Sequence, residues 1–390
     1  MTAIAIPLLL QDSRFLPNLL SCAKQALGGV LVSIARIAQS MRSRMPWPVG
    51  RRILLENEVS RGRGWDQTLG KLIHNAGRLE TKIEPLVDAL REHILCGEKI
   101  STFYEVAPDA MEASRNALLS ATIPTSPFSE AYPYLLSEDE LLNAPAGIFL
   151  AAVETNEDGV AAVFSSVRVV TVREPILPTD VPEAAAEIFD DYEEIVGLKT
   201  IRLHACDTVW LPHDGKHIDV RIDYPVGTLH EVAVAAQARV ADAFHEIVGV
   251  RLLATPVNLF PLIDRIYKDP KEGTVVELGF GTTTSSLKHE KMRRKMLDLR
   301  EEQYHKGGKA ALQTPIEPFR LSIVWKRLAG NGVISNPEMS INSSARSAGA
   351  QLPCIETVVI RKCMGQADYE FVRSRIEHHL AAKPETKGEG

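Results

Sequence analysis

The residues best suited to chemistry in this sequence are two sets of cations, one near each end. In the first set, between residues 42 and 64, arginines alternate with glycine and proline, and tryptophans stand beside them. Guanidinium groups next to a flexible backbone and an aromatic ring are typical of contacts with phosphates and stacked bases. From this set, the residues that we predict to contact nucleic acid are Arg51, Arg52, Arg61, Arg63 and Trp65.

The second set follows a glycine-containing turn at 279–286 (GFGTTTSS). Three of its lysines are spaced by three and four residues, which places them on one face of a helix predicted over 287–300. Further cations surround a glycine pair downstream, and such a segment can follow a phosphate backbone. The residues predicted from this set are Lys288, Lys291, Arg294, Lys295, His305, Lys306 and Lys309.

The distribution of charge along the chain supports this interpretation. Residues 1–100 carry a net charge of +5, residues 101–270 carry −16, and residues 271–390 carry +5, within an overall charge of −6. A basic, acidic, basic order attracts anions to the ends of the chain and repels them from its middle. The alternative is structural: charge runs are often solvated faces, and the arginines can pair with the acidic middle instead.

Sequence motifs for catalysis are weak in this chain. There is no GxSxG or HExxH motif, and the turn at 279–286 lacks both the third glycine of a dinucleotide fingerprint and the lysine of a P-loop. We therefore predict no catalytic residue, no metal and no cofactor. An enzyme acting on a phosphate-bearing substrate within 279–309, through Asp298 and His305, remains the alternative. A weaker one is a metal-dependent nuclease built from Asp207 and the turn at 214–216.

Cysteine content and hydropathy indicate the cellular compartment and whether a membrane is a partner. The five cysteines form no CxxC pair, so a disulfide framework is not expected and a reducing, cytoplasmic setting fits. The apolar stretch at 3–10 has no preceding positive charge and is short for a membrane span, so we predict neither a signal peptide nor a membrane partner.

The elements that must position these residues indicate an α+β fold with a mainly antiparallel sheet. Apolar residues at three- and four-residue spacing predict helices over 13–41 and 65–96, and Pro85 is expected to break or kink the second one near Glu84. Between them, 42–64 is predicted to be an arm or long loop with one short helical turn. Alternating strands around Asp158-Gly159 and residues 213–216 predict two hairpins. An acidic helix is predicted over 182–196, and a further helix over 229–248. The predicted division is a helical N-terminal domain (1–123), a hairpin and linker region (124–182), an α+β domain (183–380) and a disordered tail (381–390).

Together these observations predict a non-catalytic component of a larger assembly that contacts nucleic acid, of unspecified type, through its basic ends. Protein partners or self-association are expected beside it. The supposition behind this prediction is that the two basic sets converge into one patch. A structural subunit that meets only protein is the second alternative, and an antiviral system is a general expectation that no particular residue supports.

Overall fold

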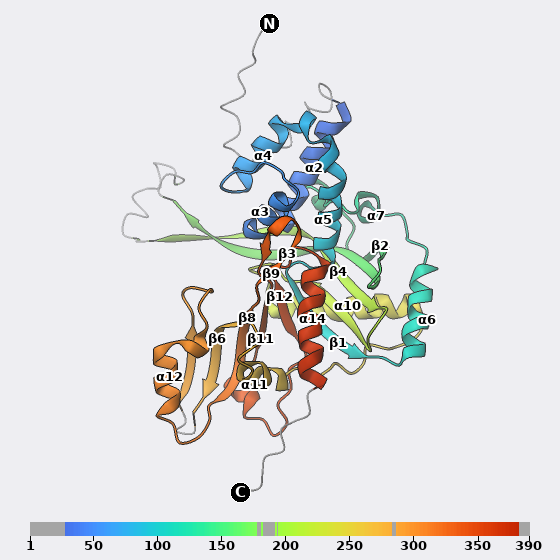
Figure 1. The fold of residues 1–390 in the computed structure, drawn as a ribbon. Helices are drawn as coiled ribbons and strands as arrows, with labels where there is room; N and C mark the ends of the chain where they lie inside the picture. The colour runs from blue at the N-terminus through green and yellow to red at the C-terminus, as the bar shows by residue number, and fades with distance from the viewer. Residues whose placement is uncertain (1–27, 178–180, 182–191, 193, 283–285, 382–390) are drawn as a thin grey trace.

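The chain folds around one long antiparallel sheet of ten strands. The computed structural model describes residues 28–177, 181, 192, 194–282 and 286–381. The strand order is β2-β3-β4-β5-β1-β12-β11-β8-β6-β7, and a separate two-stranded ribbon pairs β9 with β10 (Figure 1). The α+β class with a mainly antiparallel sheet is therefore confirmed.

The strands, in chain order, are β1 (Lys99–Glu105), β2 (Phe149–Thr155), β3 (Gly159–Ile176), β4 (Ile195–Pro212), β5 (His217–Asp223), β6 (Thr274–Gly281), β7 (Leu287–Lys291), β8 (Glu317–Val324), β9 (Arg327–Leu328), β10 (Ile334–Ser335), β11 (Glu338–Asn342) and β12 (Val358–Arg361). The α-helices are α2 (Gly28–Arg44), α3 (Trp47–Glu56), α4 (Trp65–His74), α5 (Ile83–Cys96), α6 (Pro108–Leu119), α7 (Pro127–Ala131), α8 (Glu138–Asn143), α10 (His230–Val248), α11 (Pro261–Lys268), α12 (Gln303–Ala310), α13 (Ala345–Ala348) and α14 (Gln366–Ala381).

Helices cover both faces of the first half of the sheet. Along β3, Val160, Ala162 and Phe164 pack into a core with α6 and α10. The alternate residues, Ala161 and Val163, pack into a second core with α2–α5. Because successive side chains of a strand point to opposite faces, this arrangement explains why the first part of β3 reads as a continuous apolar run. The other half of the sheet, from β12 to β6, shares a third core with α11 and α14.

A buried ion cluster fastens the N-terminal helices to the sheet. Asp223, at the end of β5, accepts hydrogen bonds from Lys99 Nζ at 2.6 Å, from Arg44 Nη2 at 2.6 Å and from the backbone N–H of Cys206 at 2.6 Å. Burial alone would raise the pKa of Asp223, but the charges of Arg44 and Lys99 outweigh it and lower that pKa. Arg44 ends α2, so the helices of the first basic set are tied to the middle of the sheet.

Several sequence-based element predictions agree with the structure. The two hairpins form β2–β3 and β4–β5, and the helix predicted over 229–248 is α10. The acidic helix predicted over 182–196 and the tail 381–390 lie almost wholly outside the described residues, although Ile195 already begins β4. Of the helix predicted over 13–41, only the part from Gly28 is described, and there it is α2.

Other element predictions are wrong. The segment 42–64 holds more helix than the one short turn predicted within it, because α3 takes up 10 of its residues, with Pro46 at its N-cap and Pro48 in its first turn. The helix predicted over 65–96 is interrupted, but not at the predicted place near Glu84: two short 3-10 turns separate α4 from α5, and Pro85 falls in the first turn of α5. The helix predicted over 287–300 is absent: residues 287–291 form the edge strand β7, and a 3-10 turn follows at Leu299–Glu301.

Candidate nucleic-acid interface

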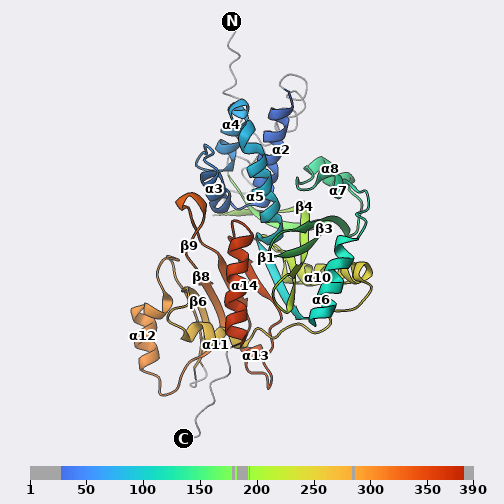
Figure 2. The ribbon, with the colours of Figure 1, turned by 45° about the vertical axis from the view of Figure 1, so that its right-hand side comes forward.

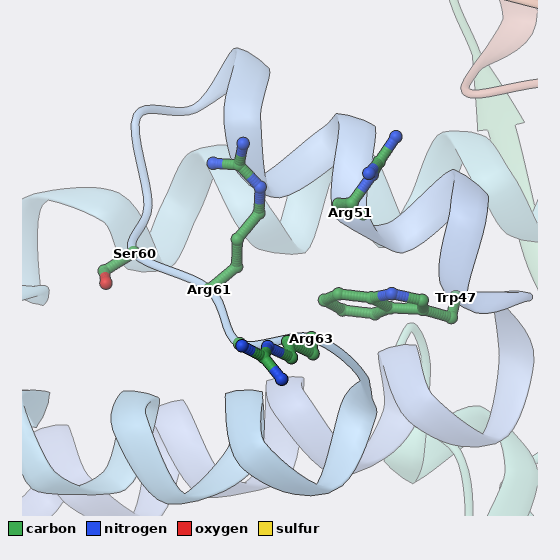
Figure 3. A pocket seen from close by; sticks show the side chains of 6 residues that line it. Trp47, Arg51, Ser60, Arg61 and Arg63 are labelled. Carbon is green, nitrogen blue, oxygen red and sulfur yellow. The ribbon is translucent and has the colours of Figure 1, made fainter.

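The first basic set forms an open pocket on the N-terminal helices. Its volume is about 590 Å³, and Figure 3 shows its side chains around one opening. The residues that line it are Trp47, Arg51, Ser60, Arg61, Gly62 and Arg63. Three arginines and one indole therefore meet in one place.

Two tryptophans build the aromatic wall of this pocket. The ring centroids of Trp47 and Trp65 lie 5.4 Å apart in an edge-to-face arrangement, and Trp65 Nε1 donates to the carbonyl of Met45 at 2.9 Å. Gly50 on α3 permits this packing, because a Cβ at that position would lie 2.2 Å from the Trp65 ring. Trp65 thus supports Trp47, and the pocket is lined by Trp47 rather than by the predicted Trp65.

The arginine-bearing loop is held by its backbone. Thr68 Oγ1 accepts from the N–H of Gly62 at 2.9 Å and donates to the carbonyl of Gly64 at 2.7 Å. Lys71 Nζ donates to the carbonyl of Arg61 at 2.9 Å. These bonds fix the main chain from 61 to 64 without using the guanidinium groups, so the arginine side chains are presented by a fixed backbone.

The pocket arginines have no acidic partner in the part of the chain that the structure describes. Within the described part of the chain, the guanidinium groups of Arg51, Arg61 and Arg63 make no ion pair and no side-chain hydrogen bond. Arg52 differs, because its Nη2 donates to Asn336 Oδ1 at 2.5 Å. Burial first, and the charge of Arg51 second, lower the pKa of Arg52. Cations that repel one another without a compensating carboxylate form a site of positive potential.

The second basic set lies elsewhere and is largely engaged with neighbouring side chains. Figures 1 and 2 both show α3 and α4 at one end of the molecule and α12 beside the far edge of the sheet, so the two sets are not brought into one patch. Lys288 and Arg294 have no side-chain partner among the described residues. The others are paired: Lys291 with Glu277, Lys295 with Glu338, His305 with Glu290, Lys306 with Glu301 and Lys309 with the Tyr267 hydroxyl.

His305 belongs to a hydrogen-bonded line that the sequence did not reveal. Its Nδ1 lies 2.6 Å from Glu290 Oε2, and its Nε2 lies 2.8 Å from the Tyr267 hydroxyl. His305 and Tyr267 are buried, and their edge-to-face rings sit between α11, α12 and the edge of the sheet. Both imidazole nitrogens are satisfied inside the fold, which is the pattern of a structural histidine.

The residues of the two enzyme alternatives have structural partners. Asp298 pairs with Arg300, which also donates to the carbonyls of Glu272 and Gly273 and so attaches the turn to the segment just before β6. Asp207 is buried and pairs with Arg168 at 2.7 Å. Lys216 pairs instead with Glu105 on the surface. Asp207 and Lys216 therefore do not share a site, as the nuclease alternative requires.

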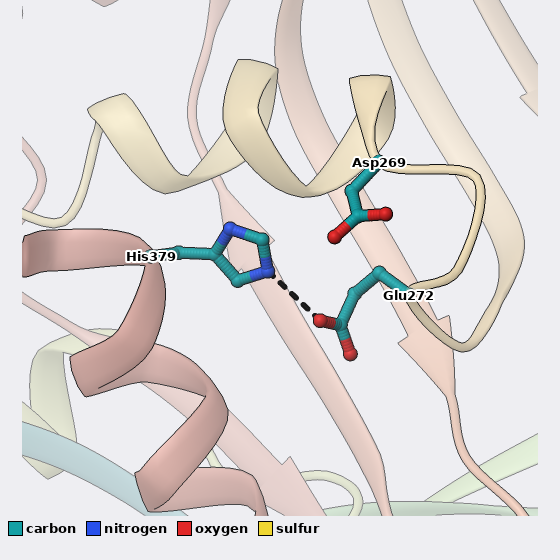
Figure 4. A group of neighbouring side chains, drawn as sticks. All are labelled: Asp269, Glu272 and His379. Carbon is teal, nitrogen blue, oxygen red and sulfur yellow. Dashed lines mark hydrogen bonds and ion pairs between the residues drawn. The ribbon is translucent and has the colours of Figure 1, made fainter. Parts of the chain in front are cut away.

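One group of side chains has the composition of a metal site. Ligand atoms of Asp269, Glu272 and His379 lie within 4.8 Å of one another (Figure 4). Glu272, however, accepts from His379 Nε2 at 2.8 Å, from Trp325 Nε1 at 2.6 Å and from Arg375 Nε at 2.9 Å. The guanidinium of Arg375 already supplies a positive charge to the Glu272 carboxylate, in the place that a metal ion would take. We therefore assign Asp269, Glu272 and His379 to the stability of the fold.

Glu272 gives a pH-dependent stability prediction. Burial would raise its pKa, but hydrogen bonds from His379, Arg375 and Trp325 hold it at about 2. A carboxyl with a lowered folded-state pKa stabilises the fold above its ordinary pKa, and this contribution is lost as the pH falls toward the folded value. We expect Glu272→Gln to lower the free energy of unfolding by about 1–3 kcal/mol at pH 7, and less at pH 3. Urea unfolding of wild type and variant at pH 7 and at pH 3 measures the two free-energy differences. An equal loss at the two pH values would contradict the stabilising role of the ionised Glu272 carboxylate.

Comparison with known proteins adds no assignment, because no family model, no curated protein and no solved structure matches this chain. Among the described residues, no helix has the length and apolar character needed to cross a membrane. The geometry of the pocket is therefore the main guide to function.

Proposed function

We propose that this protein contacts nucleic acid through the pocket lined by Trp47, Arg51, Arg61 and Arg63, as a non-catalytic component of a larger assembly. The observation that carries the proposal is the presence, around one indole, of three arginines that have no acidic partner among the described residues. Guanidinium groups bind phosphate oxygens in a bidentate manner, and an indole offers a stacking surface for a base. A reducing cytoplasm is the proposed setting, because the four described cysteines are all free.

The proposal rests on the first basic set alone. Trp65 supports Trp47 from outside the pocket lining, whereas Arg52 bonds to Asn336. We give the paired cations near β7 and α12 a structural role. Lysines on an edge strand such as β7 also discourage pairing with a strand of another molecule. Lys288 and Arg294 stay as predicted secondary contacts to a backbone that extends beyond the pocket.

The experiment that tests the proposal compares polyanions with and without bases. Fluorescence anisotropy with labelled single-stranded DNA, single-stranded RNA, duplex DNA and heparin should show binding that weakens with salt. We expect Trp47→Ala to weaken single-strand binding about tenfold, since stacking on an aromatic side chain contributes about 1–3 kcal/mol per base. Heparin has no bases, so its affinity should change little.

Tyr304→Ala is the matched control for loss of an aromatic ring, because Tyr304 is 73% exposed on α12, away from the pocket. Absence of binding to every nucleic acid at low salt would overturn the proposal. Equal losses for heparin and for single strands in Trp47→Ala would show that the indole only shapes the pocket, and would remove the stacking part of the proposal.

A further inference from the structure

The arginine pocket offers one aromatic surface and not a row of them. Of the two neighbouring tryptophans, Trp47 lines the opening and Trp65 does not. The Trp65 ring is held in the fold, because its Nε1 donates to the Met45 carbonyl and a Cβ on Gly50 would lie 2.2 Å from it. Surfaces that follow a running single strand carry several aromatic side chains, on which successive bases stack. This pocket provides for one stacked base.

The positive charge around that base exceeds what one internal nucleotide needs. Arg51, Arg61 and Arg63 line a space of about 590 Å³, a size typical of sites for one small molecule. An internal nucleotide brings one negative charge per base, on its phosphodiester. A phosphomonoester at a strand end carries about two negative charges at pH 7, and the diester beside it carries a third. Three guanidinium groups around one indole thus match the charge of a terminal nucleotide.

Side chains, and not backbone amides, are available to hold a phosphate in this pocket. The N–H of Gly62 already donates to Thr68 Oγ1 at 2.9 Å, and the N–H of Arg63 donates to Gln67 Oε1 at 3.1 Å. The Ser60 hydroxyl and the three guanidinium groups, by contrast, have no hydrogen-bond partner among the described residues. A phosphomonoester presents three strong acceptor oxygens, and a guanidinium group binds such oxygens two at a time.

Carboxylates flank the arginine-bearing loop along the chain. Glu58 and Asp66 lie just before and just after residues 60–63, and their side chains are 74% and 79% exposed. Each is paired with a cation, Glu58 with Lys82 at 3.1 Å and Asp66 with Arg42 at 2.9 Å. Carboxylates repel phosphates, so the positive potential is concentrated in the pocket. This arrangement favours a strand that ends in the pocket over one that continues on both sides of it.

We propose that the pocket binds the end of a single strand, with the terminal base stacked on Trp47 and the terminal phosphomonoester held by Arg51, Arg61 and Arg63. This inference rests on the proposed function of the same pocket and names the part of the nucleic acid that it recognises. Guanidinium groups bind the phosphate and not the sugar. A 5′-phosphate and a 3′-phosphate are therefore the two sources of the recognised group.

Competition against an internally labelled single strand tests the proposal. The competitors share one sequence and differ in their ends: a 5′-phosphate, a 3′-phosphate, hydroxyl groups at both ends, or a closed circle. We expect a phosphate at one end or the other to raise affinity about tenfold over the hydroxyl-ended strand, and the circle to bind no better than that strand. Free adenosine monophosphate lacks the neighbouring diester and should bind at least about tenfold more weakly than the phosphorylated strand.

A variant links the preference for a phosphorylated end to the pocket. Arg63→Ala should reduce this preference to about threefold or less, because one guanidinium partner of the phosphate is lost. Arg239→Ala is the matched control, since Arg239 is exposed on α10, away from α3 and α4 in both views of the fold. It should keep the preference of the wild type. Circular dichroism checks the fold of both variants, and the competitor series on the wild type tests the proposal even where Arg63→Ala fails to fold.

The possible results separate this inference from the proposed function. Equal affinities of phosphorylated, hydroxyl-ended and circular strands would overturn the inference and leave the proposed function standing. Binding of adenosine monophosphate as tight as that of the phosphorylated strand would also overturn it, because the pocket would then serve a free nucleotide. So would a preference that Arg63→Ala leaves unchanged. Absence of binding to every strand would instead overturn the proposed function, and this inference with it.

Discussion

Asp223→Ala is expected to lower the free energy of unfolding by about 3–5 kcal/mol, the largest effect on stability that we predict for a single substitution. The wild-type carboxylate holds Lys99 and Arg44 in the interior, where the Lys99 side chain has no exposure to solvent and the Arg44 side chain has 7%. Removal of the carboxylate leaves both cations buried without their main partner. Urea unfolding followed by circular dichroism gives the free-energy difference.

Asp214→Ala is the control for this experiment, because Asp214 is exposed in the turn between β4 and β5. Its effect should stay within about 0.5 kcal/mol. A loss below about 1 kcal/mol for Asp223→Ala would contradict the role of the cluster. Because Arg44 ends α2, the same substitution should loosen the attachment of the N-terminal helices, and hydrogen exchange in α2 should rise accordingly.

The joint replacement Arg51→Ala, Arg61→Ala and Arg63→Ala is expected to reduce nucleic-acid affinity about 100-fold at low salt, which corresponds to about 2.7 kcal/mol. These guanidinium groups have no carboxylate partner among the described residues, so the replacement removes charge from the pocket and leaves no buried acid unpaired. The fold should therefore be preserved, since the loop is held by Thr68 and Lys71 through backbone atoms.

The matched control removes three positive charges from other surfaces. Arg239, Arg251 and Lys271 are exposed and lie outside the pocket. Their joint replacement by alanine changes the net charge by the same amount. An equal loss of affinity in both triple variants would mean that binding follows overall charge and not the pocket.

Local patterns in the sequence were sufficient for much of the fold. Alternation of apolar and polar residues located β5, and turn residues located the hairpins β2–β3 and β4–β5. The strand β1 was missed, although it occupies the middle of the sheet. Its residues 99–105 follow α5 after only two residues, so they read as the end of a helical region, and their strand state depends on pairing with β5 and β12.

Tertiary pairing also explains the error at residues 287–300. Lysine, glutamate and methionine at that spacing have helical propensity, which predicted one basic helix. In the structure, β7 pairs with β6, and Lys291 and His289 both contact Glu277 on that neighbouring strand. The regularly spaced cations therefore form separate ion pairs with neighbouring strands. Their spacing in the sequence alone does not predict these pairs.

The candidate site was partly predictable. Composition identified Arg51, Arg61 and Arg63, because arginines beside glycine and tryptophan are a recognisable combination. It did not distinguish Arg52, which turns toward Asn336, from Arg51 one residue earlier. The difference arises from the helix α3, on which successive residues point about 100° apart, and from the contact of α3 with β10, which Asn336 directly follows.

The most direct test of the central claim is the salt dependence of nucleic-acid affinity in the wild type and in the variant that lacks Arg51, Arg61 and Arg63. The logarithm of affinity falls linearly with the logarithm of salt concentration, by a slope of about 0.7 per neutralised phosphate for single strands. We predict that the triple replacement makes this slope shallower by about 2, the value for three lost contacts. Parallel lines for wild type and variant would contradict the claim.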